Sequence, residues 1–262
     1  MLSKEKLLEG LNAKSLSTRC KSLKKLLKLE SFNSELAPVS KEIVPLHFSS
    51  NMYYSSYSPT LCAYLAHKCG CFALAVNDYA TVSSYKELKK ACEILKMPYA
   101  CGYHVYTEPL FNEKKGVVFG YGVANLYQKA LNEDLKEFRL TKLENVKKII
   151  KRINKVLLPF NLSISEREVI DKKKVKKGGS VTEKDVAKHL AEKLVKKYGK
   201  GEELLKFLKV ALRVDSCEKE LPFLIETENT YFVEDLTKVI YLNYQIFQSK
   251  TKNKVVDSVL AI

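Results

Sequence analysis

The chain has 262 residues, of which 46% are hydrophobic and 29% charged, which is enough apolar material for one large globular domain or two small ones. It contains no run of about 18 apolar residues, and its N-terminus lacks the apolar core of a signal peptide. These features exclude a membrane partner, and we expect a cytoplasmic protein.

The formal net charge of +15 comes overwhelmingly from lysine. Lysines gain free energy by releasing counterions from phosphate, so the charge leaves nucleic-acid binding open. A lysine-rich surface equally serves solubility, and charge alone does not choose between these roles.

The seven cysteines lie in apolar contexts such as "LCAYLA" and "KACEIL", and no C-x-x-C pair occurs. A structural zinc site needs two ligand pairs at short spacing. We therefore expect reduced, packed thiols rather than a zinc site or disulfides.

In chain order, residues 2–30 predict two short helices, the second with Cys20, Leu23 and Leu27 on one face. A short apolar strand over Ile43–Leu46 follows, and then a loop rich in serine and tyrosine, "HFSSNMYYSSY". Long loops after strands are common places for functional sites.

The next helix has clear start and stop signals, because Ser58 is a good N-cap, Pro59 suits the first helical position and Gly70 follows the end. The apolar run 71–76 predicts a strand that is covered on both faces.

A further helix is expected to end at Leu95, with Ser84 and Glu87 as its capping box. Two more strands are predicted in "YACGYHVYTE" and "GVVFGYGV". This alternation of strands and helices favours parallel strands, in an open sheet or a barrel.

From Ala124 the pattern becomes helical, with a long amphipathic helix before Pro159 and a later helix whose expected capping box is Ser180 with Glu183. An apolar stretch runs to Ile262 without a cap, which suggests a chain cut short inside a larger fold. We expect an N-terminal helical arm (1–40), the first part of an α/β barrel (41–123), a helical insertion (124–214) and a truncated continuation of the barrel (215–262).

Three metal-binding residue types are expected at or near the carboxyl ends of successive strands. They are His47, Asp78 and His104. Parallel α/β folds build their sites at this edge of the sheet. A histidine at a strand end is also commonly a hydrogen-bonded structural residue, so His47 and Asp78 have a plain structural interpretation as well.

The order His47-Phe48-Ser49, then "YSPT", "ALAVNDYATVSSYKELKKACEILKMPYACGYHV", "VVFGYGV" and "GGSVTE", resembles the polymerase and histidinol phosphatase (PHP) family, over most of the chain. The resemblance implies a distorted TIM-like (β/α)7 barrel that holds up to three zinc, manganese or iron ions and hydrolyses phosphoesters. Clustered metals lower the pKa of a bridging water and neutralise the phosphate charge.

Most of the family's ligand positions are substituted in this chain. His47-Phe48-Ser49 keeps the first histidine of a His-x-His motif, and Asp78-Tyr79-Ala80 keeps one residue of Asp-His-Asp. His104 stands where the family has a glutamate, and Val117 and Asp185 stand where relatives have histidines. We expect no cofactor, or at most a single divalent zinc, manganese or iron ion at His47, Asp78 and His104.

Three interpretations remain. We favour a catalytically inactive, incomplete PHP-like protein, in which tyrosines such as Tyr53 and Tyr79 fill the space of the metals. The alternatives are a residual single-metal phosphoesterase, which a second chain would complete, and a basic nucleic-acid-binding protein that displays the lysines of residues 142–209.

Overall fold

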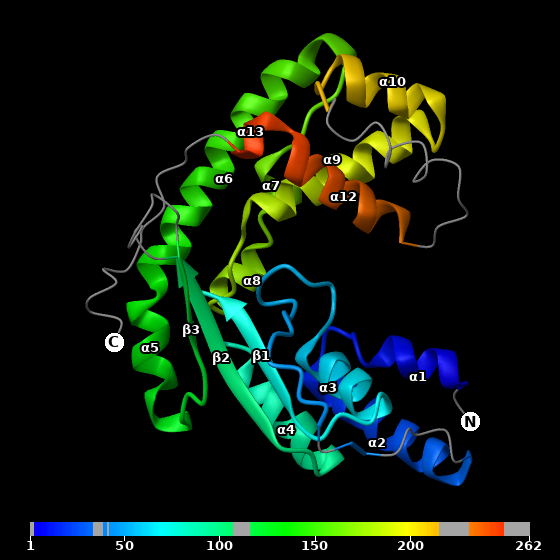
Figure 1. The fold of residues 1–262 in the computed structure, drawn as a ribbon, viewed down its shortest axis with the longest axis vertical. Helices are drawn as coiled ribbons and strands as arrows, with labels where there is room; N and C mark the ends of the chain where they lie inside the picture. The colour runs from blue at the N-terminus through cyan, green and yellow to red at the C-terminus, as the bar shows by residue number, and fades with distance from the viewer. Residues whose placement is uncertain (1–2, 34–38, 41, 107–115, 215–230, 249–262) are drawn as a thin grey trace. The chain divides into compact units, whose positions relative to one another are not determined.

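A computed structural model describes residues 3–33, 39–40, 42–106, 116–214 and 231–248 (Figure 1). Two compact units divide these residues: one holds those up to Arg139 together with Lys176–Ser180, and the other holds Leu140–Val175 and those from Val181 onward. The four-part domain division stays a prediction. The expected C-terminal apolar helix lies outside the described residues.

The first unit is a mixed α/β structure. Its strands are β1 (Leu74–Tyr79), β2 (Tyr99–Tyr106) and β3 (Val117–Gly120). Its helices are α1 (Lys4–Gly10), α2 (Leu16–Asn33), α3 (Pro59–Lys68), α4 (Tyr85–Leu95), η1 (Asn125–Tyr127) and α5 (Gln128–Asp134). The sheet has the order β1-β2-β3, and the complete barrel stays a prediction.

The expected parallel pairing is confirmed for β1 and β2, in a register that places Tyr79 opposite His104. It is wrong for β3, which pairs antiparallel with β2.

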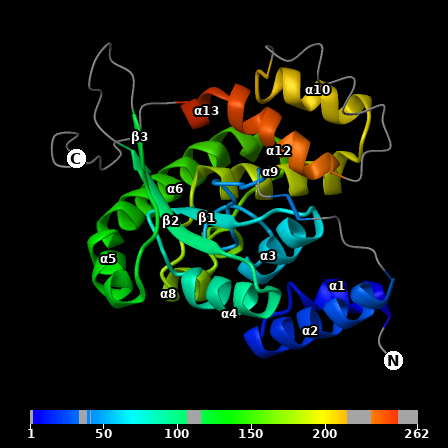
Figure 2. The same cartoon turned by 60° about the horizontal axis from the view of Figure 1, so that its bottom comes forward.

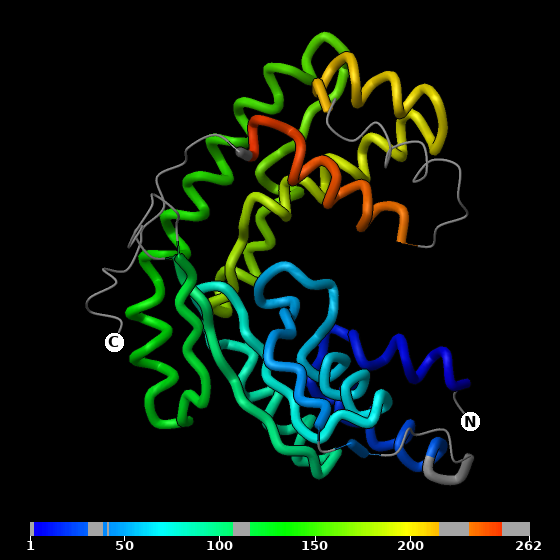
Figure 3. Tube along the Cα trace, viewed as in Figure 1, coloured from blue at the N-terminus to red at the C-terminus, as the bar shows by residue number. Residues whose placement is uncertain are grey.

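The predicted strand Ile43–Leu46 belongs to a segment, 43–48, that runs parallel to the outer side of β1 without forming a regular ladder, and Figure 3 traces it beside β1. The Ala75 N–H donates to the Pro45 carbonyl, and the Phe48 N–H donates to the Ala75 carbonyl. Pro45 has no N–H to donate, which explains the interrupted ladder.

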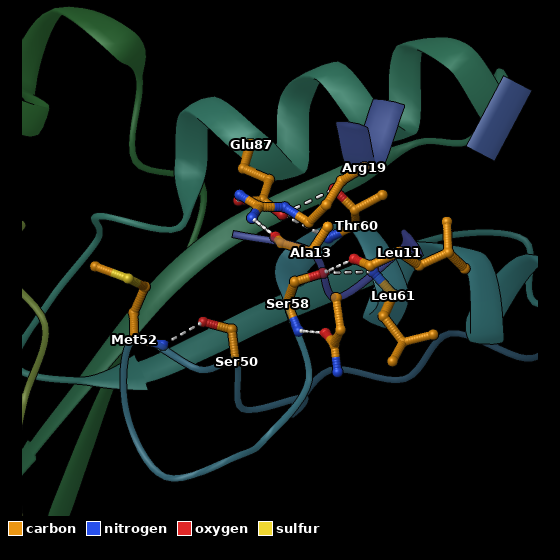
Figure 4. A network of polar contacts seen from close by, with 10 residues as sticks. Leu11, Ala13, Arg19, Ser50, Met52, Ser58, Thr60, Leu61 and Glu87 are labelled. Carbon is orange, nitrogen blue, oxygen red and sulfur yellow. Dashed lines mark hydrogen bonds and ion pairs between the residues drawn. The ribbon is translucent and has the colours of Figure 1, made fainter. Parts of the chain in front are cut away.

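The predicted start of α3 is confirmed, because the Ser58 hydroxyl accepts from the Leu61 N–H and Pro59 is the first helical residue. The same hydroxyl donates to the Leu11 carbonyl at 2.6 Å, and the Ser58 N–H donates to Asn12 Oδ1 (Figure 4). The cap therefore also ties the turn between α1 and α2 to the start of α3.

Helices α3 and α4 pack against each other and cover one face of the sheet, as Figure 2 shows from below. On this face Leu74, Val76 and Cys101 are buried together with apolar side chains of both helices. β1 is buried along its whole length, as predicted for a strand covered on both faces, but it begins at Leu74 rather than Cys71, and Phe72 of the predicted run is exposed.

The second unit is helical throughout the part of the chain that the structure describes. Its helices are most of α6 (Lys136–Leu157), then η2 (Leu158–Phe160), α7 (Glu166–Val169), α8 (Lys172–Lys176), α9 (Glu183–Tyr198), α10 (Glu202–Val210), α12 (Phe232–Asn243) and α13 (Gln245–Gln248). Val186, Leu190 and Leu194 of α9 lie in its core, and α9 packs against α12. None of the described helices of the chain is both long and apolar enough to cross a bilayer.

Two predicted capping boxes are wrong in detail. Ser84 precedes α4 but makes no side-chain cap, since Glu87 accepts hydrogen bonds from Thr60 instead. Thr182, rather than Ser180, caps α9 in a box with Asp185.

Candidate functional site

The carboxyl ends of three parallel segments meet at one edge of the sheet, where the sequence predicted the site. Segment 43–48 lies on one side of β1 and β2 lies on the other. His47, Asp78 and His104 all reach this edge, but they do not form one group.

The structure brings His47 and His104 together. Their ring centroids are 5.5 Å apart, with His104 buried and His47 exposed. His104 Nδ1 lies 2.7 Å from Asn77 Oδ1, and the Asn77 amide nitrogen donates to the Tyr103 carbonyl. Because Oδ1 only accepts, this contact requires the proton on His104 Nδ1.

Aromatic rings surround this histidine pair. The ring centroids of Tyr53, Tyr79 and Phe119 lie 5.2, 5.6 and 5.7 Å from that of His104. Phe119 also packs edge-on against His47, at 5.4 Å between centroids. The site around His104 is therefore a packed aromatic cluster rather than a ring of carboxylates.

Asp78 is fully buried and binds a different partner, Ser50. The Ser50 N–H donates to Oδ1 and the Ser50 hydroxyl donates to Oδ2, both at 2.7 Å. Asn77 and Tyr79 contact His104, and side chains alternate along a strand, so Asp78 points to the opposite face of the sheet. This is the face that α3 covers.

Ser50 is the site residue that sequence reasoning missed, because the comparison of motifs drew attention to Ser49. Its hydroxyl also accepts from the Met52 N–H at 3.1 Å, a contact drawn in Figure 4. The alternation of side chains along extended segments indicates this contact. Phe48 pairs with Val76, and every second residue lies on the same face, so Ser50 lies beside Asp78.

Ser180, from the "GGSVTE" stretch, holds the same loop from the other end. Its N–H donates to the Met52 carbonyl at 2.7 Å, and its hydroxyl donates to the Tyr79 carbonyl. Ser180 is fully buried. Asp78 and Ser180 thus fix the loop after segment 43–48 to the end of β1.

The thiols near Asp78 are held in their protonated form. Burial, followed by the negative charge of Asp78, raises the pKa of Cys62 well above its usual range. Burial is also the main cause that raises the pKa of Cys101 to about 12. Nucleophilic attack needs a thiolate, so the raised pKa disfavours that role for both thiols.

The donors in the described residues do not fit the metal cluster that the resemblance implies. Within those residues, no three histidine, cysteine or acidic side chains lie close enough together to hold an ion. Asp185, for which the resemblance implied a histidine, accepts from the Thr182 N–H at 2.7 Å and caps α9.

No protein family model matches the chain, and no curated protein matches it. An amidohydrolase from Chromobacterium violaceum, solved with bound sulfate and no metal, is 18% identical, with a TM-score of 0.48 over 64% of this chain and 55% of that chain. A proposed metal-dependent phosphoesterase from Bifidobacterium adolescentis is 18% identical, with a TM-score of 0.47 over 77% of this chain and 65% of that chain. The chain therefore spans less than two thirds of the length of either protein.

Proposed function

We propose that this chain is a catalytically inactive PHP-like protein, in which hydrogen bonds and aromatic packing have replaced the metal site. The observation that carries the proposal is the pairing of Asp78 with Ser50. Both carboxylate oxygens of Asp78 accept hydrogen bonds from Ser50 in a fully buried position. A carboxylate held in this way stabilises a loop and is poorly placed to ligate an ion.

The chemistry of the remaining donors supports the same proposal. A metal cluster that activates water for attack on a phosphoester needs several carboxylates and neutral imidazoles around a shared space. His47 and His104 supply two imidazoles, and the rings next to them belong to Tyr53, Tyr79 and Phe119. The hydroxyl groups of neutral tyrosines are weak replacements for those ligands.

A residual single-metal phosphoesterase is the second candidate, and the contact between His47 and His104 is the observation that favours it. Two imidazoles with solvent in the other positions would hold one zinc, manganese or iron ion weakly. Asp78 would have to leave Ser50 and reach the other face of the sheet to join them.

Metal content and turnover separate the two candidates. The purified chain would be loaded with zinc, manganese or iron, desalted, and analysed for bound metal and for hydrolysis of nitrophenyl phosphate esters. We expect far less than one equivalent of metal and no turnover. His47→Ala and His104→Ala should then behave like His189→Ala, a matched control whose ring donates to the Asp185 carbonyl within α9.

The opposite result is equally clear. Stoichiometric metal and turnover that are lost in His47→Ala and His104→Ala, but kept in His189→Ala, would establish the single-metal enzyme. Both candidate functions are compatible with a second chain that completes the barrel. The mass of the protein in solution tests whether such an assembly forms. Nucleic-acid binding by the lysines of residues 142–209 stays a prediction, and the steepness of its salt dependence would measure it.

A further inference from the structure

A long open groove lies between α2 and α4, within the first unit and away from the histidine pair. Its volume is about 1250 Å³. The residues that line it come from these two helices and the turn after α4: Leu16, Ser17, Cys20, Lys21, Lys24, Leu27, Lys28, Lys90, Glu93, Ile94 and Lys96.

The floor of the groove consists of apolar residues of α2 that lie next to the core. Leu23 and Leu26 are fully buried in the core of the first unit. Leu16, Cys20 and Leu27 lie on the same helix face as Leu23, are only half-buried and line the groove, and Leu27 also packs against that core. The face of Cys20, Leu23 and Leu27 that the sequence predicted therefore extends from the core to the groove.

The rim of the groove is strongly basic. Five lysines line it, three on α2 and two at α4, against one glutamate, Glu93. Glu93 forms an ion pair with Lys89 on the same helix, at 3.8 Å. Lys24 lies on the α2 wall and Lys90 on the α4 wall, and both are exposed. Burial, the largest effect, raises the pKa of Cys20, whereas the positive charges of these two lysines lower it. An anionic ligand in the groove would therefore meet positive charge on both sides.

The walls of the groove are tied together beside it. The Arg19 guanidinium of α2 binds the Glu87 carboxylate of α4 and the Ala13 carbonyl, and Glu87 also accepts from the Thr60 hydroxyl (Figure 4). Both side chains of the ion pair are largely buried. A groove with fixed walls loses little conformational entropy when a ligand enters it.

We propose that this groove binds an acidic amphipathic helix of a partner protein. Its volume exceeds the roughly 300–1,000 Å³ of small-molecule pockets, which points to a polymer segment. An aliphatic floor between two basic rims matches a helix with leucines on one side and carboxylates flanking them. Single-stranded nucleic acids bind through aromatic stacking platforms, and among the residues that the structure describes no aromatic side chain lines this groove.

The inference goes beyond the proposed loss of the metal site and does not depend on it. The direct test is fluorescence anisotropy with a labelled peptide of about 18 residues, with leucine every three or four residues and glutamate elsewhere. A peptide of scrambled sequence and the same composition, and an oligothymidine of about 20 nucleotides, are the comparison ligands.

The variants are matched in helix and in charge. Lys24→Glu combined with Lys90→Glu reverses one charge on each wall, and should weaken binding of the amphipathic peptide by about tenfold or more. Lys25→Glu combined with Lys86→Glu makes the same change at exposed lysines of α2 and α4 that do not line the groove, and should change the Kd less than about twofold.

A second readout needs no variant of the protein. Bound peptide should slow the alkylation of Cys20, which lines the groove, and leave that of the exposed Cys69 unchanged. Absence of binding, equal loss in both pairs of variants, or equal protection of Cys20 and Cys69 would overturn the proposal. Preferential binding of the oligothymidine, lost with Lys24→Glu and Lys90→Glu, would overturn it in favour of nucleic acid.

Discussion

The substitution Asp78→Asn tests whether the retained carboxylate is a structural group or a remnant of a metal site. Asp78 accepts two hydrogen bonds of 2.7 Å from Ser50 in a fully buried position. An asparagine of the same shape offers one acceptor oxygen and one amide donor. Its oxygen can accept from the Ser50 N–H, and its amide group then faces the Ser50 hydroxyl, which loses the acceptor for its own proton.

The expected cost follows from that geometry. One hydrogen bond to a charged acceptor is lost and the other becomes a bond between neutral groups. Since hydrogen bonds to charged groups contribute about 1.5–3 kcal/mol, Asp78→Asn should lower the free energy of unfolding by about 2–3 kcal/mol. A metal ligand without its metal predicts the opposite sign, because the protein without metal gains or keeps stability when a strained functional carboxylate is neutralised.

Urea unfolding in the presence of a chelator, followed by circular dichroism, measures this difference. Ser50→Ala completes a double-mutant cycle, and the coupling energy between positions 50 and 78 should exceed about 1 kcal/mol. Ser49→Ala, on the same segment, is the matched control and should stay within about 0.5 kcal/mol of the wild type. The structural interpretation fails if Asp78→Asn is as stable as the wild type or more stable.

Two further predictions concern the second unit. Lys142 and Glu183 form a buried ion pair at 2.9 Å, so Lys142→Met alone should destabilise the fold by about 3 kcal/mol, whereas Lys142→Met with Glu183→Leu should recover most of that loss in the same urea assay. The hydrogen bond from the Ser165 N–H, followed by that from Lys193, lowers the pKa of Glu168 from 4.5 to about 2. A carboxylate whose pKa is lower in the folded state stabilises the fold at pH values above its unfolded pKa. Thermal melts should therefore show a lower Tm for Glu168→Gln than for the wild type near about pH 6. The difference in Tm should vanish as the pH falls through 4.5 towards 2.

The sequence predicted helices and strands correctly where residues close together in the chain determine them. The N-cap at Ser58 depends on neighbouring residues and is confirmed, and β1 is buried throughout as predicted, although it begins at Leu74 rather than Cys71. The direction of β3 depends on its connection, and only ten residues lie between Tyr106 and Val117. A parallel crossover needs about a dozen residues or more, so the antiparallel pairing could have been predicted from the length of this connection.

The capping boxes failed for a different reason, because distant partners compete for the same carboxylates. Glu87 has the spacing of a capping residue for Ser84, but it binds Arg19 and Thr60, which lie far from it in sequence. Glu183 likewise binds Lys142, 41 residues away. The spacing of residues in the sequence identifies only the local capping partner, and an ion pair with a distant residue can be more stabilising than that cap.

The contacts of the candidate site also depend on residues that are distant in sequence, because they are set by the register of the strands. Strand ends could be predicted from the sequence, and they do meet at one edge. Which residues share a face depends on the register, and a shift of one residue exchanges the faces. Because Tyr79 pairs with His104, the tyrosine lies beside the histidine pair and Asp78 faces α3 and Ser50. Asp78 and His104, two candidate ligands of the proposed single-metal site, therefore lie on opposite faces of one sheet, and one ion would not contact both in this arrangement.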